Sequence, residues 1–116
     1  MEVRQKQRRY AATMPKEVER MAERLGSNIE TARLRRRWRQ ADLAGKAGIT
    51  RATLASIEKG KLTAGIGAYM AALWALGLDD QLKSLADPPS DQEGITLESS
   101  RANRRARPRV TLTDDF

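Results

Sequence analysis

The stretch QADLAGKAGITRATLASIEKG, residues 40–60 of the 116-residue chain, decides the fold. Its first half places apolar side chains on one side of a helix and ends at Gly48, a residue that readily takes the positive φ of a tight turn. Thr50 can cap a second helix, in which Leu54 and Ile57 face inward. The stretch therefore predicts two short helices joined by a tight turn.

Two helices joined in this way form the helix-turn-helix arrangement, whose second helix lies in the major groove of DNA. The outer face of that helix, where we expect contacts with bases, consists of Arg51, Ala52, Ala55 and Ser56. Arg51 is the strongest reader, because a guanidinium can bond to O6 and N7 of one guanine, which is worth ~1–3 kcal/mol of discrimination. Ser56 can donate or accept a hydrogen bond, whereas the two alanines can only touch a thymine methyl group. We expect Thr53 to contact a phosphate.

Helical patterns continue on the N-terminal side of this stretch. Apolar residues within 14–25 recur on one helical face, and Gly26 follows them directly, which predicts a short amphipathic helix. Ser27 and Glu30 form a capping-box signature, so we expect a new helix to begin there.

Two further helices are predicted after the central stretch. Apolar residues within 66–76 recur at helical spacing, and Asp79 can cap a last short helix that extends to Ala86. We therefore expect an all-α domain of five short helices over residues 27–86, with Arg51 exposed. We also expect Ser56 to be exposed. The core is expected to contain Leu43, Ala44, Ala47, Leu54, Ile57, Leu73 and Leu76, with Trp38 and Trp74 also at core positions.

Composition divides the chain into three segments. These are a basic arm with the short helix at 1–26, the five-helix domain at 27–86, and an acidic linker with an arginine-rich tail at 87–116. We expect the tail to be flexible. Residues 95–97 and 110–112 alternate apolar and polar side chains, so either stretch could form a short strand if another segment supplied an edge.

The chain contains neither histidine nor cysteine. Their absence removes imidazole bases, thiol nucleophiles, disulfides and thiolate metal sites, and with them most enzyme chemistry. We expect no catalytic activity, no cofactor and no metal. The longest apolar stretch, residues 68–78, is about half of the ~20 residues that a membrane-spanning helix needs, and no signal-peptide core follows the basic first residues, which predicts a soluble cytoplasmic protein without a membrane partner.

The net charge of +7 is concentrated in the first third of the chain, where residues 1–40 hold 12 Lys and Arg against 5 Asp and Glu. Most of these are arginines, whose guanidinium can clamp a phosphate in bidentate fashion. The pattern favours a nucleic-acid partner. A basic protein that binds RNA or is only structural is an alternative, but the aromatic content of 4% speaks against stacking on single-stranded RNA.

Around the stretch 40–60, and over roughly residues 29–78, the sequence resembles the Cro/cI-type (XRE) helix-turn-helix family. The resemblance implies double-stranded DNA as the partner and a phosphate contact from Gln40. It also implies an ion pair between Arg33 and Glu58, and an approach of Lys61 to the DNA backbone.

A narrower resemblance, to antitoxins of the HipB type, rests on five pieces of sequence. These are IETARLRR at 29–36, QADLA at 40–44, Tyr69, LWALGL at 73–78 and LADP at 85–88. Such antitoxins pair with a HipA-type kinase toxin and repress their own operon. The alternative is a stand-alone Cro/cI-type regulator without a toxin partner, and a gene for a large kinase-like protein directly downstream would decide between the two.

Two residues depart from the family pattern, which usually has Gly at the end of the first helix and Ser or Thr before the second. Here the positions hold Arg37 and Arg39. The missing cap should cost ~1 kcal/mol, and a left-handed residue other than glycine about as much. With Arg35 and Arg36 they cluster beside Gln40, where a helix N-terminus would approach phosphates. The phosphate contacts we expect are Arg39, Gln40, Thr53, Lys59 and Lys61.

A monomer of this size covers only half of an operator. We therefore expect a two-fold homodimer whose recognition helices lie about 34 Å apart, one turn of B-DNA. The apolar candidates for its surface are Ile66, Tyr69, Leu78, Leu82 and residues 95–97.

Overall fold

The computed structural model describes residues 14–106, and within them it contains helices and no strand, which confirms the all-α prediction. The chain forms two compact units that divide between Leu82 and Lys83. No helix within the described residues is both long enough and apolar enough to cross a membrane.

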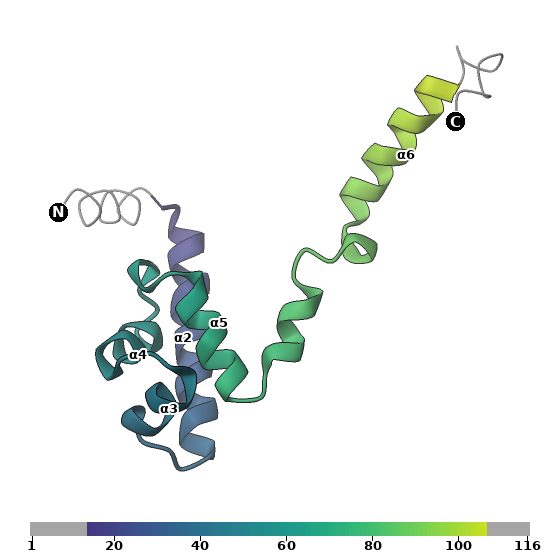
Figure 1. Cartoon of the computed structure of the whole chain (residues 1–116). Helices are drawn as coiled ribbons and strands as arrows, with labels where there is room; N and C mark the ends of the chain where they lie inside the picture. The colour runs from purple at the N-terminus through teal and green to yellow at the C-terminus, as the bar shows by residue number, and fades with distance from the viewer. Residues whose placement is uncertain (1–13, 107–116) are drawn as a thin grey trace. The chain divides into compact units, whose positions relative to one another are not determined.

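The first unit holds the predicted pair of helices. Its elements are α2 (Lys16–Arg35), α3 (Gln40–Ala47), α4 (Arg51–Glu58), the 3-10 turn η1 (Leu62–Ala64) and α5 (Ile66–Ala75). As Figure 1 shows, α3, α4 and α5 gather beside the long α2. Helix α4 packs against α2, α3 and α5, and α3 also packs against α5. Helix α4 is therefore held from three directions.

The centre of the core consists of Ile29, Leu43, Leu54 and Ile57, each at most 1% exposed. Ala44, Leu73 and Leu76 are buried as well, as expected. Two expected core residues are not. Ala47 is half-buried because it ends α3, and Trp74 is 62% exposed because it lies on the face of α5 that turns away from the core.

The prediction of two helices before residue 36 was wrong, since α2 runs without a break through Gly26. Gly26 is buried in the middle of α2, and a Cβ there would meet the backbone oxygen of Ile57, with Gly60 N only 2.8 Å away. Gly60 in turn lies against the backbone of Glu23. The glycine at 26 permits α2 and the end of α4 to touch backbone to backbone, so it is not a helix end.

Helices α2 to α5 all end in the same way, with a residue of positive φ just after the last turn. At three of these ends the residue is glycine, at positions 48, 60 and 77. At the end of α2 it is Arg37, with φ 57°. The N–H of Arg37 donates to Leu34 O at 2.9 Å and that of Trp38 donates to Arg33 O at 3.3 Å, the Schellman pattern that satisfies the last carbonyls of a helix.

The segment after α5 differs from expectation. In place of a fifth α-helix, residues Asp79–Ser84 form the 3-10 helix η2, and Ala86 has a positive φ of 54°. Pro88–Ser90 form a further 3-10 turn, η3, and Gln92–Ala106 form α6. Residues 95–97 are thus helical, not a strand. The first thirteen residues, the stretch 110–112, Arg107 and Arg109 lie outside the described residues.

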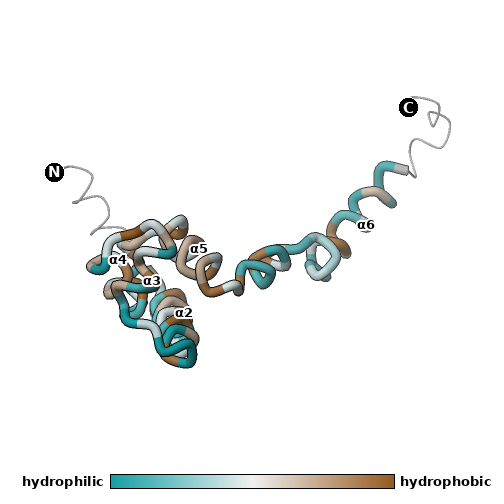
Figure 2. Tube along the Cα trace, turned by 60° about the horizontal axis from the view of Figure 1, so that its bottom comes forward, coloured by the Kyte–Doolittle hydropathy of each residue, from teal (hydrophilic) through white to brown (hydrophobic). Residues whose placement is uncertain are grey.

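Helix α5 is apolar on all sides, and Figure 2 shows it mostly pale to brown where α6 carries teal along much of its length. Of the residues expected on a dimer surface, Ile66 is 70% exposed, but Tyr69 is buried at 7%. Leu78 and Leu82 pack against the core and are half-buried. Periodicity could not decide which face of α5 turns inward, because both are apolar.

Replacing Gly26 with alanine should destabilise the protein by about 2–3 kcal/mol, since the new Cβ forces two backbones apart. Gly45→Ala is the matched control, because Gly45 also lies in a helix but has nothing within 4 Å of a Cβ. We expect Gly45→Ala to stabilise by ~0.5–1 kcal/mol through helix propensity. Urea unfolding of both variants measures the difference, and equal effects would contradict the close crossing.

Candidate nucleic-acid interface

Helix α4 begins at a well-formed cap. Thr50 Oγ1 accepts the N–H of Thr53 at 3.0 Å and its own hydroxyl donates to Thr53 Oγ1 at 2.8 Å. These bonds satisfy one of the free N–H groups of the first turn. Arg51 and Ala52, the first two residues of the helix, are exposed. The turn and cap therefore present Arg51 to solvent on a helix whose opposite side is buried.

The remaining expected base readers are less accessible. Ala55 and Ser56 are half-buried, so the expectation that Ser56 is exposed was wrong. They lie between Leu54 and Ile57, which are completely buried, so the packing of α4 covers part of both side chains. Of the four side chains expected to contact bases, only Arg51 is both long and polar, and it is exposed.

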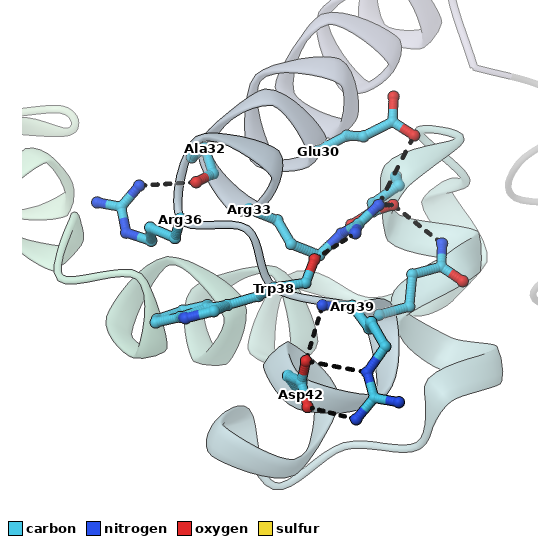
Figure 3. A network of polar contacts seen from close by, with 9 residues as sticks. Glu30, Ala32, Arg33, Arg36, Trp38, Arg39 and Asp42 are labelled. Atoms are coloured by element: carbon cyan, nitrogen blue, oxygen red, sulfur yellow. Dashed lines mark hydrogen bonds and ion pairs between the residues drawn. The ribbon is translucent and has the colours of Figure 1, made fainter.

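Glu58, the last residue of α4, joins three helices through its carboxylate. Arg33 of α2 donates from Nε to Oε2 at 2.6 Å and from Nη2 to Oε1 at 3.0 Å. The two side chains are only 8% and 3% exposed. Arg33 Nη1 also donates to Trp38 O at 2.8 Å (Figure 3). The hydrogen bonds to Glu58 raise the pKa of Arg33 above its ordinary value, so the guanidinium stays charged.

Gln40, the first residue of α3, is the third member of this network. Its Nε2 donates to Glu58 Oε1 at 3.0 Å. The bond places the N-terminus of α3 beside the C-terminal end of α4. Because an amide nitrogen carries two hydrogens, Gln40 keeps one N–H that can meet a phosphate while the other holds Glu58.

The start of α3 is capped from inside the helix. Asp42 Oδ2 accepts the backbone N–H of Arg39 at 2.8 Å, and the guanidinium of Arg39 lies 3.3 Å from the same oxygen. The bond from the backbone of Arg39 is the main cause that lowers the pKa of Asp42. Asp42 thus offsets part of the missing cap at Arg39, whose side chain remains 85% exposed.

The arginines at the end of α2 have different environments. Arg36 donates to Ala32 O at 2.8 Å and to Leu76 O at 3.0 Å, so it ties the ends of α2 and α5 together. Arg35 and Arg37 are exposed and make no ion pair with any residue from 14 to 106. Sequence reasoning did not find the tie of Arg36, because a run of arginines carries no signal for which one reaches backbone carbonyls.

Trp38 forms a second contact that the sequence did not predict. Its ring is half-buried, with Lys46 Nζ 4.8 Å and Arg36 Cζ 6.0 Å from its centroid. A cation over the face of an aromatic ring contributes about 0.5–1 kcal/mol at exposed sites. These contacts therefore stabilise the turn that leads into α3.

Beyond α4, Lys59 and Lys61 are exposed. The backbone of Lys61 is anchored at both groups, since its N–H donates to Ser56 O at 3.0 Å and its carbonyl accepts the hydroxyl of Tyr69 at 3.0 Å. Burial raises the pKa of that hydroxyl, so it keeps its proton. Both lysines thus extend into solvent from a fixed backbone.

Removing one partner of the buried pair should destabilise the protein more than removing both. Arg33→Met or Glu58→Met leaves an uncompensated buried charge, which typically costs about 3–5 kcal/mol, whereas the double variant leaves none. Urea unfolding of the two single variants and the double variant gives the coupling free energy. Losses that simply add would contradict the network, and the exposed Arg39–Asp42 pair, treated in the same way, should show much weaker coupling.

Comparison with known proteins agrees with this geometry. No curated protein and no solved structure shows significant similarity to the chain. Residues 24–86 match the family described as "Helix-turn-helix domain", and this range contains α3, the turn at Gly48 and α4. The chain therefore belongs to this helix-turn-helix family, whose members bind DNA.

Proposed function

We propose that this protein is a sequence-specific transcriptional repressor that binds operator DNA as a two-fold dimer, with α4 in the major groove. The observation that carries the proposal is the exposed Arg51 in the first turn of a helix whose other side is fully buried. A side chain placed in this way can enter a groove while the domain behind it stays rigid.

The flanks of α4 support the same docking. Arg39 and Gln40 lie at the start of α3, where the helix dipole favours a phosphate, and the Gln40–Glu58 bond places that start beside the end of α4. Lys59 and Lys61 extend from the end of α4. With Thr53, these side chains are the proposed phosphate contacts that set the position of Arg51 over the bases.

The resemblance to HipB-type antitoxins extends the proposal to an autorepressor that also neutralises a HipA-type kinase toxin. A stand-alone regulator is the alternative. Purification of the protein from its native cell, followed by binding to its own promoter DNA, reports partner and site together. A co-purifying kinase-like protein supports the antitoxin, and promoter binding without one supports the stand-alone regulator.

Arg51→Ala should weaken binding to the cognate site by ~1–3 kcal/mol, change binding to random DNA little, and relax preference at one base pair in each half-site. Lys61→Ala should instead weaken binding to both DNAs. It should also flatten the plot of log affinity against log salt by about one unit for each subunit. Titrations of both duplexes at several salt concentrations measure these effects.

The same titrations need a version of each variant that lacks residues 1–13 and 107–116, because their arginines could bind phosphate on any sequence. If Arg51→Ala and Lys61→Ala still behave alike on both DNAs, α4 does not read the operator. The basic surface would then bind polyanions in general.

Arg37→Gly separates stability from DNA binding at the end of α2. It should stabilise the protein by about 1–2 kcal/mol, because glycine takes a positive φ without strain, and weaken binding to any duplex because a positive charge near the proposed contacts Arg39 and Gln40 is lost. Arg37→Ala is the matched control, which loses the guanidinium without the gain in stability. Unfolding curves and duplex titrations test both, and unchanged DNA affinity in both variants would remove Arg37 from the interface.

A further inference from the structure

The segment that follows α4 lies against the first half of α2, within the first unit. A Cβ on Gly60 would meet Cα and N of Glu23, so the two backbones touch at this point. Gly60 stands between Lys59 and Lys61, and both lysines therefore start from backbone beside Glu23. An open hollow of about 390 Å³ lies here, lined by Glu19, Glu23 and residues 59–63. Two carboxylates and two proposed phosphate contacts thus share one hollow.

The carboxylates do not neutralise the lysines. Within residues 14–106, neither lysine forms an ion pair with Glu19 or Glu23. Lys59, Lys61 and Glu23 are exposed, and Glu19 is half-buried. The lysines are therefore available to a phosphate, and any phosphate that reaches them also comes close to two acidic side chains.

The stability of α2 accounts for Glu19 but not for Glu23. Glu19 lies in the first turn of the helix, where a negative charge is favourable. Glu23 lies one turn further, where this effect has faded, and two acidic residues four positions apart weaken a helix slightly. Arg20, three positions before Glu23, makes no ion pair with it in the described part of the chain. The contact with residues 59–61 is the feature that distinguishes Glu23.

We propose that Glu23, together with Glu19, lowers the affinity of the protein for DNA that lacks the operator sequence. The inference rests on the proposed function, in which Arg51 in the groove selects one docked position and the lysines hold phosphates from the end of α4. On other DNA no base contact selects that position. Phosphates then also approach the lysines from the side of α2, where like charges at short range make binding unfavourable.

Repulsion of this kind is an ordinary source of specificity. Discrimination is a difference between two affinities, and unfavourable contacts with the wrong partner increase it as well as favourable contacts with the right one. A basic domain binds any duplex through its phosphates, so an acidic edge on the basic surface removes affinity that carries no sequence information. Both carboxylates lie before residue 24, where the family match begins, so this edge belongs to the part of α2 that the match does not cover.

Titration of a random-sequence duplex and of the protein's own promoter DNA tests the proposal with the full chain. Glu23→Gln should lower the dissociation constant for random DNA about fivefold and that for the promoter less than twofold. It should also steepen the plot of log affinity against log salt on random DNA. Glu17→Gln is the matched control, since it removes the same charge from the same helix but does not line the hollow. It should change neither dissociation constant by more than twofold.

A double variant shows whether the effect acts at the lysines. In a Lys61→Ala background, Glu23→Gln should lose most of its effect on random DNA, because phosphates are no longer attracted to the hollow as strongly. Urea unfolding of Glu23→Gln should match that of the wild type, because the side chain is exposed and makes no ion pair within residues 14–106. A change in DNA binding then does not arise from a change in folding.

An unchanged affinity of Glu23→Gln for random DNA overturns the proposal. So does weaker binding of this variant to both duplexes, which would mean that the carboxylate orients the lysines. An equal effect of Glu17→Gln also overturns it, because net charge alone would then explain the change. A wild type that binds its promoter no more tightly than random DNA contradicts the proposed function, and tightening on random DNA by Glu23→Gln but not by Glu17→Gln would still support the repulsion.

Discussion

The carboxylate of Glu58 is the constraint on which the arrangement of the helices depends. It ends α4, receives two hydrogen bonds from Arg33 of α2, and receives a third from Gln40 of α3. A carboxylate that is 3% exposed would be costly without such partners, so the fold that satisfies it is strongly preferred over folds that do not. The same bonds set the tilt of α4 and hold Gln40 where a phosphate can reach it.

A backbone contact acts together with this network. Gly26 and Gly60 let α2 meet the end of α4 without intervening side chains, two residues beyond Glu58. The hydrogen bonds determine how α4 is rotated and the glycines determine how near it lies to α2. The hydrogen bonds alone would not fix the distance between the helices, because a guanidinium on a long side chain can reach over a range of distances. The glycine contact alone would not fix the rotation of α4, because two backbones can touch at a range of rotations.

The central helices could be predicted because their signals are local. Gly48 ends α3 and Thr50 caps α4 through atoms within four residues, so no knowledge of the rest of the chain was needed. Gly26 was misread because a glycine after an apolar pattern resembles a helix end, and only its contact with Ile57, 31 positions away, shows otherwise. The accessibility of Ser56 and Trp74 likewise depends on neighbouring helices that periodicity does not locate.

Lys61 links the surface proposed to contact DNA to helix α5. Its side chain extends toward solvent at the end of the basic surface, and its carbonyl accepts the hydroxyl of Tyr69 from the buried side of α5. This bond fixes the backbone of Lys61 against α5, so a phosphate that meets the lysine side chain would be held relative to the buried core of the domain. Because α4 packs against the same core, the proposed phosphate contact at Lys61 and the proposed base contact at Arg51 would keep a fixed separation within one domain.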